Sequence, residues 1–474
     1  MPQQVNNATL KSTIGWFLIL IVPLAIYFYM SHSGGQYQTT AFLSIISISL
    51  IMWIFELLPD FIPGLFAILM LLLFDIAPQE IVMSGFSSSS LFLALSVLGL
   101  GAVITSSGLS YRYSLMMLKV LPANTFWYSL GLFFTGILFT PLVPAIIGRA
   151  SIVGPILTEI VSNCDKNGKK QASTMLFSSS FNGITFLSAT FLTSTPLNFI
   201  IFSMLPAQEQ SDFNFLYWFY ASSVVFFVMI VLYVLVSSIY YRSYVNIDLS
   251  KKIVEKKLEE LGGLTKNEWA AIIGIILLGI GLLTTTVHKI DIPWVAFSIL
   301  FLLLFFQAIS RDDFRRQIDW SFLLLLGSTV GVVATMNHLG LDEDMAKQLA
   351  WLGSYMVNDF QMFVILLTIT IIGIRFFVPM NTTILIFAAT LIPLASSAGM
   401  NAWLIGFLIL LIAETSIFPY QAPFFLYFKQ ITQDNIEYDE RKVYIFHVIL
   451  ISVKLIAVYI SIAYFWDGYL LFTE

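Results

Sequence analysis

The chain has 474 residues, of which 58% are hydrophobic and 11% are charged, and its formal net charge is −5. In soluble proteins about a quarter of all residues are charged. This composition therefore excludes a soluble globular protein and indicates a chain that lies mostly in lipid. The small net charge gives no basis for binding nucleic acid. The single cysteine, Cys164, excludes an intrachain disulfide bond.

The apolar segments are continuous and rich in Leu, Ile and Phe, which favours membrane-spanning helices over the alternating strands of a barrel. We interpret the first segment as a retained helix, because no small-residue cleavage site follows it. The expected segments are 13–30, 41–57, 61–75, 89–107, 124–160, 172–200, 214–240, 267–286, 291–309, 319–337, 361–396, 402–428 and 443–465.

Segments 124–160 and 361–396 are too long for one crossing, and prolines interrupt both. Pro141 and Pro144 lie within the first, and Pro379 lies within the second. Each segment is therefore either a pair of full helices or a re-entrant hairpin that returns to its starting side. We favour hairpins, which leaves about 11 transmembrane crossings.

Basic residues set the expected orientation, because loops on the cytoplasmic side of a membrane are rich in Lys and Arg. With a cytoplasmic N-terminus, the outside loops hold only Lys289 and Lys347. The C-terminus then lies outside. The basic residues expected on the cytoplasmic side are Lys11, Arg112, Lys119, Lys166, Lys169, Lys170, Arg311, Arg315, Arg316, Lys429, Arg441, Lys442 and those of the run 242–266.

Glycine and proline spacings indicate an internal duplication, in which each half has three helices, a hairpin, a broken helix and a final helix. Five crossings per half would place the second half upside down, which is the inverted-repeat architecture of secondary transporters. The matched positions are Gly99 with Gly331, Gly108 with Gly340, Pro141 with Pro379, Pro155 with Pro393, and Pro196 with Pro423.

These patterns divide the chain into two repeats joined by a polar linker. The linker has apolar residues on one helical face and lysines beside them, which suits a cytoplasmic amphipathic helix on anionic headgroups or a plain solvated connection. The expected divisions are an N-terminal region with the first helix at 1–40, repeat 1 at 41–240, the linker at 241–266, repeat 2 at 267–465 and a tail at 466–474.

The helix breaks are the candidate functional positions, because unpaired backbone groups are tolerated in a membrane only where they are buried in protein or line a cavity. Side-chain oxygens and freed carbonyls suit Na⁺, whereas inward-pointing helix N-termini suit an anion. The alternative is that the prolines only kink helices whose hydroxyl groups bond to backbone carbonyls. The four candidate breaks are 140–149, 188–198, 379–383 and 414–423.

Ionisable residues within the spans are few, and such residues need a partner or water. Arg149 follows the first hairpin tip, where it could contact an anion or serve as a built-in positive charge. Glu414 could pair with Arg149 or Arg375 as a purely structural contact, or it could carry a proton. Lys454 is expected to reach an interface or pair with another group.

At these breaks the sequence resembles the divalent anion–sodium symporter family, which carries dicarboxylates and sulfate, over roughly residues 41–465. The resemblance implies two hairpin tips that bind sodium and substrate carboxylate, a homodimer, and a scaffold made from the early helices of each half. The motifs that carry it are Trp53–Pro59, Ile318-Asp319-Trp320, Thr195-Pro196-Leu197-Asn198, the tip Asn381-Thr382 and Tyr420-Gln421-Ala422-Pro423.

The sequence departs from the family at the first tip, where Val143–Ile146 has neither hydroxyl nor amide side chains. Arg149 could therefore replace a missing cation. The expected substrate contacts are Arg149, Thr195, Pro196, Asn198, Asn381, Thr382, Thr383, Gln421 and Pro423. The expected sodium ligands are Ser188, Thr190, Asn381, Thr415 and Ser416. No other cofactor is expected.

The sequence thus predicts an all-α membrane protein that acts as a sodium-coupled, elevator-type secondary transporter of a small anion in the plasma (inner) membrane. One alternative is an exchanger or proton-coupled carrier on the same fold. Another is an integral-membrane enzyme acting on a lipid-linked sugar, which would need a large polar loop that the sequence lacks. The expected partners are the small anion, membrane lipid and a second copy of the chain.

Overall fold

The computed structural model describes residues 2–32, 34, 36–122, 124–162, 169–241, 251–341, 350–415, 421, 423–432 and 436–466. Within these residues every regular element is a helix, and none is a strand. Eight of the described helices are long and apolar enough to cross a bilayer, and shorter apolar helices stand between them. The all-helical membrane fold predicted from the sequence is confirmed.

The first half of the chain forms helices that follow the predicted segments closely. Their bounds are α1 (Pro2–His32), α2 (Tyr37–Ile54), α3 (Phe61–Leu73), α4 (Gln79–Val82), η1 (Ser84–Ser87), α5 (Ser89–Ser106), α6 (Leu109–Val120), α7 (Thr125–Phe139), α8 (Ile146–Ser162), α9 (Lys169–Thr185), η2 (Ser188–Thr190), α10 (Pro196–Met204), α11 (Ala207–Asp212) and α12 (Phe215–Tyr240).

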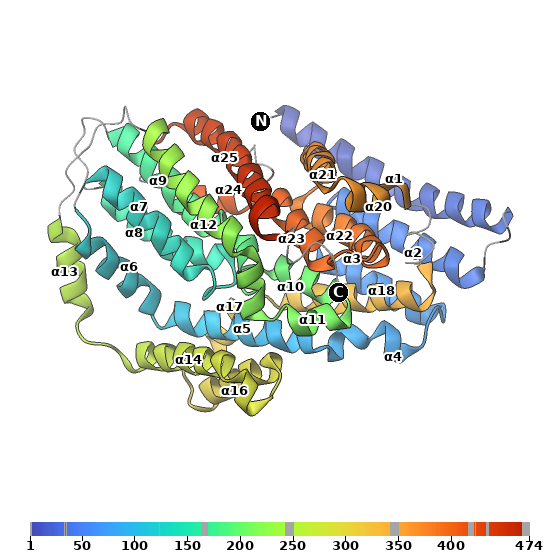
Figure 1. The fold of residues 1–474 in the computed structure, drawn as a ribbon, viewed down its shortest axis with the longest axis horizontal. Coiled ribbons are helices and arrows are strands. Elements are labelled where there is room, and N and C mark those ends of the chain that lie inside the picture. Colours follow the sequence, from blue (N-terminus) through green and yellow to red (C-terminus); the bar gives the residue numbers. More distant parts are fainter. Residues whose placement is uncertain are drawn as a thin grey trace.

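The linker and the second half contain a comparable series (Figure 1). Their bounds are α13 (Lys251–Leu261), α14 (Lys266–Leu283), α15 (Thr285–His288), α16 (Ile292–Phe305), α17 (Arg311–Gln317), α18 (Trp320–His338), α20 (Ala350–Asn358), α21 (Phe360–Ile374), α22 (Met380–Ser397), α23 (Ala402–Ala413), α24 (Pro423–Thr432), α25 (Glu440–Ser461) and η4 (Ile462–Trp466).

Both long apolar segments are interrupted at their prolines. Pro141 and Pro144 lie in the connection between α7 and α8, and α22 begins directly after Pro379. The sequence placed the second tip at 379–383, but residues 380–383 form the first turn of α22. The turn between α21 and α22 therefore lies at 375–379, because proline has a backbone suited to the start of a helix and disfavours helix in the residue before it.

The two predicted broken helices are also present. α9 and α10 are separated by residues 186–195, within which η2 forms a single short turn. α23 and α24 are separated by residues 414–422, of which 414, 415 and 421 are described. Each second segment begins at a proline, Pro196 in α10 and Pro423 in α24, where the missing N–H costs nothing.

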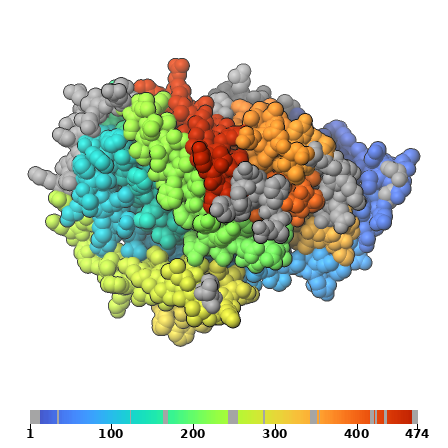
Figure 2. Space-filling model, viewed as in Figure 1, coloured from blue at the N-terminus to red at the C-terminus, as the bar shows by residue number. Residues whose placement is uncertain are grey.

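The helices of the two halves make reciprocal contacts. α16 packs on α5 as α3 packs on α18, and α24 packs on α8 as α10 packs on α22. The final helices of the two halves, α12 and α25, pack on each other and lie side by side in Figure 2. Reciprocal pairs of this kind are expected where two repeats are related by an approximate two-fold axis. The repeat limits and their sidedness stay predictions.

The core surrounds α23, whose residues are buried along its whole length. A helix that is apolar on every side needs cover on every side, and α23 receives it from α10, α21, α22 and α25. The first segment of the second broken helix therefore lies in the middle of the protein. Its C-terminal end reaches the break at Glu414.

The linker helix α13 does not leave its apolar face for lipid. Val254 on this face is 4% exposed and packs, together with Leu258 and Leu261, in a cluster that includes Leu115 and Leu118 of α6. The amphipathic helix predicted from the sequence is present, but protein covers the face that was expected to meet headgroups.

Arg112 of α6 binds the end of the linker. Its guanidinium donates to the carbonyls of residues 261–263 at 2.7 to 3.2 Å and forms an ion pair with Glu268 at 2.6 Å. Glu268 also completes a capping box with Thr265 at the start of α14. These contacts fix the linker to the first repeat immediately before the second begins.

Glu209 of α11 caps the N-terminus of α23. Its carboxylate oxygens accept the backbone N–H groups of Ala402 and Trp403 at 3.0 and 2.8 Å, and its side chain is 7% exposed. A carboxylate suits this position because the first N–H groups of a helix lack partners within the helix and carry partial positive charge. The contact joins the first half of the chain to the central helix of the second.

We expect Glu209→Ala to destabilise the protein, because it leaves two buried N–H groups without an acceptor. Each unpaired buried group costs about 1–3 kcal/mol. Thermal unfolding of the purified protein in detergent should show a clear decrease in the midpoint for Glu209→Ala and a smaller one for Glu209→Gln. The neighbouring exposed residue gives the control, Gln208→Ala, which should leave the midpoint unchanged; equal midpoints for all three variants would contradict the role of the cap.

Candidate functional site

Arg149 joins the first hairpin tip to the first helix break. The side chain is fully buried on α8, and its guanidinium donates to the backbone carbonyl of Thr140 and to the hydroxyl of Ser188, both at 3.3 Å. Thr140 is the C-cap of α7, where carbonyl groups lack partners within the helix. A positive charge therefore lies between the tip and the break; a contact of Arg149 with an anion stays a prediction.

Side chains of the first break bond mainly to other groups of the same break, most of them backbone carbonyls. The amide of Asn198 donates to the carbonyl of Ser188 at 3.0 Å and to that of Phe191 at 2.7 Å, and its oxygen accepts the hydroxyl of Thr195 at 2.9 Å. The hydroxyl of Ser194 also donates to the Ser188 carbonyl. Thr195, Pro196 and Asn198 are thus together, and they fix the irregular backbone.

We expect Asn198→Ala to reduce transport by about tenfold or more, because several hydrogen bonds that hold the break are lost at once. Uptake by reconstituted protein is the measurement. Ser203→Ala on the same helix is the matched control, since the Ser203 hydroxyl donates to the carbonyl of Ile200 within its own helix. Equal uptake by the Asn198 variant and the Ser203 variant would show that transport does not depend on this network.

Arg375 joins the second hairpin tip to the second break in a similar manner. Its guanidinium donates to the carbonyls of Ala413 at 3.2 Å, Val378 at 3.3 Å and Gln421 at 2.6 Å. The side-chain amide of Gln421 donates back to the carbonyl of Arg375 at 3.1 Å. Each tip is therefore tied to the break of its own half by one buried arginine.

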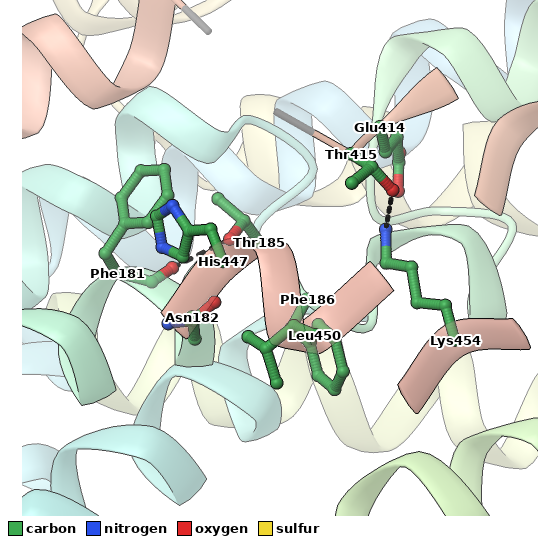
Figure 3. A pocket seen from close by; sticks show the side chains of 9 residues that line it. All are labelled: Phe181, Asn182, Thr185, Phe186, Glu414, Thr415, His447, Leu450 and Lys454. Carbon is green, nitrogen blue, oxygen red and sulfur yellow. Dashed lines mark hydrogen bonds between the residues drawn. The ribbon is translucent and has the colours of Figure 1, made fainter. Parts of the chain in front are cut away.

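A third cation, Lys454 of α25, also reaches the second break. Its ammonium group donates to the carbonyl of Leu411 at 2.8 Å and to the hydroxyl of Thr415 at 3.2 Å. Leu411 lies in the last turn of α23, so the lysine satisfies an end of the helix where the backbone dipole favours positive charge. Figure 3 shows Lys454 pointing at Thr415, and both side chains line a small cavity.

This cavity has a volume of about 40 Å³, which is room for water rather than for a dicarboxylate. Its polar lining includes Glu414 and His447 (Figure 3). Within the described part of the chain, neither Glu414 carboxyl oxygen nor the Nε2 atom of His447 has a hydrogen-bond partner. Buried polar groups of this kind are usually satisfied by water.

Glu414 is the point at which the two breaks meet. Its carboxyl group interacts electrostatically with Lys454 and with Arg149. Glu414 is the carboxylate whose charge acts on both Arg149 and Lys454. The cations of the two breaks therefore share one buried counter-charge.

The second tip also contacts the end of α2 and the connection between α2 and α3. The amide of Asn381 donates to the carboxylate of Asp60 at 2.7 Å, and the hydroxyl of Thr382 donates to the carbonyl of Trp53 at 3.2 Å. Thr383 donates to the carbonyl of Pro379 within its own helix. These three predicted substrate contacts lie at the N-terminus of α22.

The predicted sodium ligands that the structure describes already have partners. Arg149 donates to the Ser188 hydroxyl, and Lys454 donates to the Thr415 hydroxyl. The hydroxyl of Thr190 donates to the carbonyl of Leu187, and the amide of Asn381 is bound to Asp60. Ser416 lies outside the described residues. Oxygen atoms that face a protein cation do not form a favourable site for a second cation.

The sequence indicated Arg375 and Lys454 as ionisable side chains within apolar spans, which are rare and require partners. It did not assign their contacts with the second break, and it did not indicate Asp60. No local pattern indicates Asp60, because it lies in a connection between helices and meets Asn381 from a distant part of the chain.

Proteins with similar sequences are named as transporters. The chain is 25% identical over 331 residues to the "Putative malate transporter YflS" of Bacillus subtilis (strain 168), over 68% of this chain and 69% of that protein. It is 21% identical to the L-tartrate/succinate antiporter of Escherichia coli (strain K12), covering 67% of this chain and 65% of the antiporter, which is slightly under two thirds of its length.

A solved structure shares the fold. The crystal structure of the YdaH transporter of Alcanivorax borkumensis, which is described as having an unusual topology, superposes with a TM-score of 0.50 at 14% sequence identity. The match covers 81% of this chain and 88% of that one. The sequence profile of the family described as the sodium:sulfate symporter transmembrane region matches residues 10–472. The chain therefore belongs to this family, and it is a multi-pass membrane transporter and not an enzyme.

Proposed function

We propose that the protein is a secondary transporter of a small dicarboxylate, of the class that includes malate, succinate and tartrate. The observation that carries this proposal is the buried group of Arg149, Lys454 and Glu414, which brings two helix breaks together with more positive than negative charge. Membrane interiors tolerate such groups mainly along substrate and ion pathways. The relatives that are named as dicarboxylate carriers support the same class.

The helix starts beside the breaks supply further groups for an anion. α8, α10 and α22 each begin at a tip or a break, and helix N-termini offer N–H groups and partial positive charge. Thr195 and Asn198 lie at the start of α10, and Asn381 lies at the start of α22. We propose that carboxylate groups of the substrate bind between these starts, as they do at discontinuous helices of other transporters.

We propose that transport uses an elevator-like movement of the hairpin body, defined as α7 to α12 and α21 to α25, against a scaffold of α2, α3, α5, α14, α16 and α18. Both hairpin tips rest on the scaffold. A Cβ atom on Gly101 of α5 would lie 2.4 Å from Pro144 of the first tip, and Asn381 of the second tip is bound to Asp60. Glycine thus allows close contact at the first tip, and the second contact is polar and reversible.

The membrane, the orientation and the assembly remain proposals as well. We propose an inner (plasma) membrane location with the N-terminus in the cytoplasm and the C-terminus outside, because the basic loops then lie on the cytoplasmic side. A homodimer is proposed from the family resemblance. Coupling to sodium, as the resemblance implies, competes with anion exchange and with proton coupling; replacing Na⁺ with choline separates the first from the other two.

Uptake into proteoliposomes tests the proposed function. Purified protein would be reconstituted, and accumulation of radiolabelled succinate, malate, tartrate and sulfate would be compared with that in protein-free liposomes. Each substrate would be offered with a sodium gradient, with a pH gradient and with unlabelled anion inside. Dicarboxylate accumulation above the protein-free level under any of these conditions supports the proposal, and none for every dicarboxylate under all three would contradict it.

A further inference from the structure

We infer that Asp60 competes with the substrate at the second hairpin tip. Its carboxylate occupies the amide of Asn381, where a carboxylate of the substrate binds according to the proposed function. The inference rests on that function and adds a residue that sets the affinity of the same site. The substrate has to displace a carboxylate of the protein before it can bind there.

Asp60 does not use its carboxylate at its own helix. The residue is the N-cap of α3, a position at which an aspartate usually accepts a backbone N–H from the first turn. α3 is described in full, and none of its N–H groups bonds to this side chain. The Oδ2 atom instead accepts the amide of Asn381 at 2.7 Å, from a helix 321 positions away.

The backbone of Asp60 is held beside the second tip, while its side chain has room to turn. The Nε1 atom of Trp53 donates to the Asp60 carbonyl at 2.7 Å, and the Trp53 carbonyl accepts the hydroxyl of Thr382 at 3.2 Å. Trp53 belongs to the main buried cluster, whereas Asp60 is exposed. The carboxylate can therefore leave the amide without a change in the fold around it.

The position that Asp60 occupies suits a carboxylate of the substrate for the same reasons. Asn381 is the second residue of α22, so the Asp60 carboxylate lies at a helix N-terminus, where backbone N–H groups lack partners and negative charge is favoured. A substrate carboxylate would use the same amide and the same helix start. Two carboxylates at this place would repel each other, so binding of the substrate requires release of Asp60.

Competition predicts opposite effects for the two partners of this hydrogen bond. An apparent affinity is reduced to the extent that the protein is in a form that cannot bind. Removing the Asp60 carboxylate therefore raises the affinity, whereas removing the Asn381 amide takes a donor from the substrate and lowers it. Both substitutions break the same bond between scaffold and tip. A contact that only holds the tip in place would change the affinity in the same direction in both variants.

Binding of succinate tests this inference. Radiolabelled succinate would be titrated against the wild-type protein in detergent and against Asp60→Ala and Asn381→Ala, with Glu80→Ala, at an exposed position of α4, as the control for loss of a carboxylate. We expect the Kd to be at least about threefold lower for Asp60→Ala, at least about threefold higher for Asn381→Ala and unchanged for Glu80→Ala.

Weaker or unchanged binding by Asp60→Ala would overturn the inference while leaving the proposed function intact. The same holds if Asn381→Ala binds succinate as tightly as the wild type, or more tightly. Failure of the wild-type protein to bind or take up succinate, malate or tartrate would contradict the proposed function itself.

Uptake kinetics separate competition from an effect on the movement of the tip. In proteoliposomes the KM of Asp60→Ala for succinate should decrease, and the maximal rate should change less than the KM, because the competitor acts on substrate binding. A changed maximal rate with an unaltered KM would place the role of Asp60 in the movement and would overturn the inference.

Restoring a negative charge at residue 60 is an independent test. Asp60→Cys in a Cys164→Ser background has a single thiol, which would be modified in detergent with a thiosulfonate reagent that adds either a sulfonate or a neutral hydroxyl group of similar size. We expect succinate to bind more weakly after the sulfonate is added than after the neutral group is added. Equal affinities after the two reagents would show that charge at residue 60 does not compete with the substrate. Reduction should return both samples to the affinity of unmodified Asp60→Cys and show that the protein remained folded.

Discussion

Linking residue 60 to residue 381 is expected to stop transport completely. Asp60 and Asn381 are joined by a 2.7 Å hydrogen bond between the scaffold and the second hairpin tip. If the hairpin body moves past the scaffold in every cycle, this contact must break in every cycle. Cysteines at both positions, in a Cys164→Ser background that has no other cysteine, would be joined by a short thiol-reactive cross-linker, and anion uptake would be measured before and after linking.

The matched control is a link between two parts of the hairpin body. Lys170 of α9 and Glu437, just before α25, form an exposed ion pair at 2.8 Å, and cysteines there would accept the same reagent. We expect most of the uptake to remain after this link is formed, because both positions belong to the hairpin body. Undiminished uptake with the 60–381 link in place would exclude movement of the second tip away from Asp60. Reduction of a cleavable linker should restore uptake and show that the protein remained folded.

The helix breaks were predictable because they follow from local chemistry. Pro141, Pro144 and Pro196 remove backbone donors or clash with the preceding turn, and a membrane gives a broken helix no water to compensate. The boundary at the second tip was placed a few residues too late. Asn381, Thr382 and Thr383 looked like tip residues because their side chains are polar, whereas the proline before them allows the helix to begin at once.

The partners of the site residues were much less predictable. The contacts Arg149–Ser188, Lys454–Leu411 and Asn381–Asp60 join residues that are 39, 43 and 321 positions apart. Helical periodicity says which face of a segment is apolar, but not which distant segment will meet it. The sequence identified buried charge as significant at Arg149 and Glu414. It assigned hydroxyl oxygens to sodium because nothing in the local pattern shows that a protein cation already reaches them.

Arg375→Ala is expected to abolish transport and to destabilise the protein strongly. The substitution removes a cation from the carbonyls of Val378, Ala413 and Gln421, all of which lie at the second tip or the second break. Hydrogen bonds to charged groups contribute about 1.5–3 kcal/mol each, so the loss of three is a large part of the stability of a typical protein, about 5–15 kcal/mol. We expect both the yield of folded protein and its half-life on heating in detergent to decrease severely.

Arg375→Lys distinguishes charge from geometry at this position. Lysine keeps the positive charge, but a single ammonium group cannot reproduce the planar fork that reaches three carbonyls. We therefore expect an intermediate heating half-life for Arg375→Lys and, once corrected for the amount of folded protein, a slower rate of anion uptake. Arg315→Ala, at an exposed position of α17, controls for the loss of an arginine in general. If Arg375→Ala had the same heating half-life as Arg315→Ala, the second tip would be held to its break by other contacts, and the parallel between the two buried arginines would be lost.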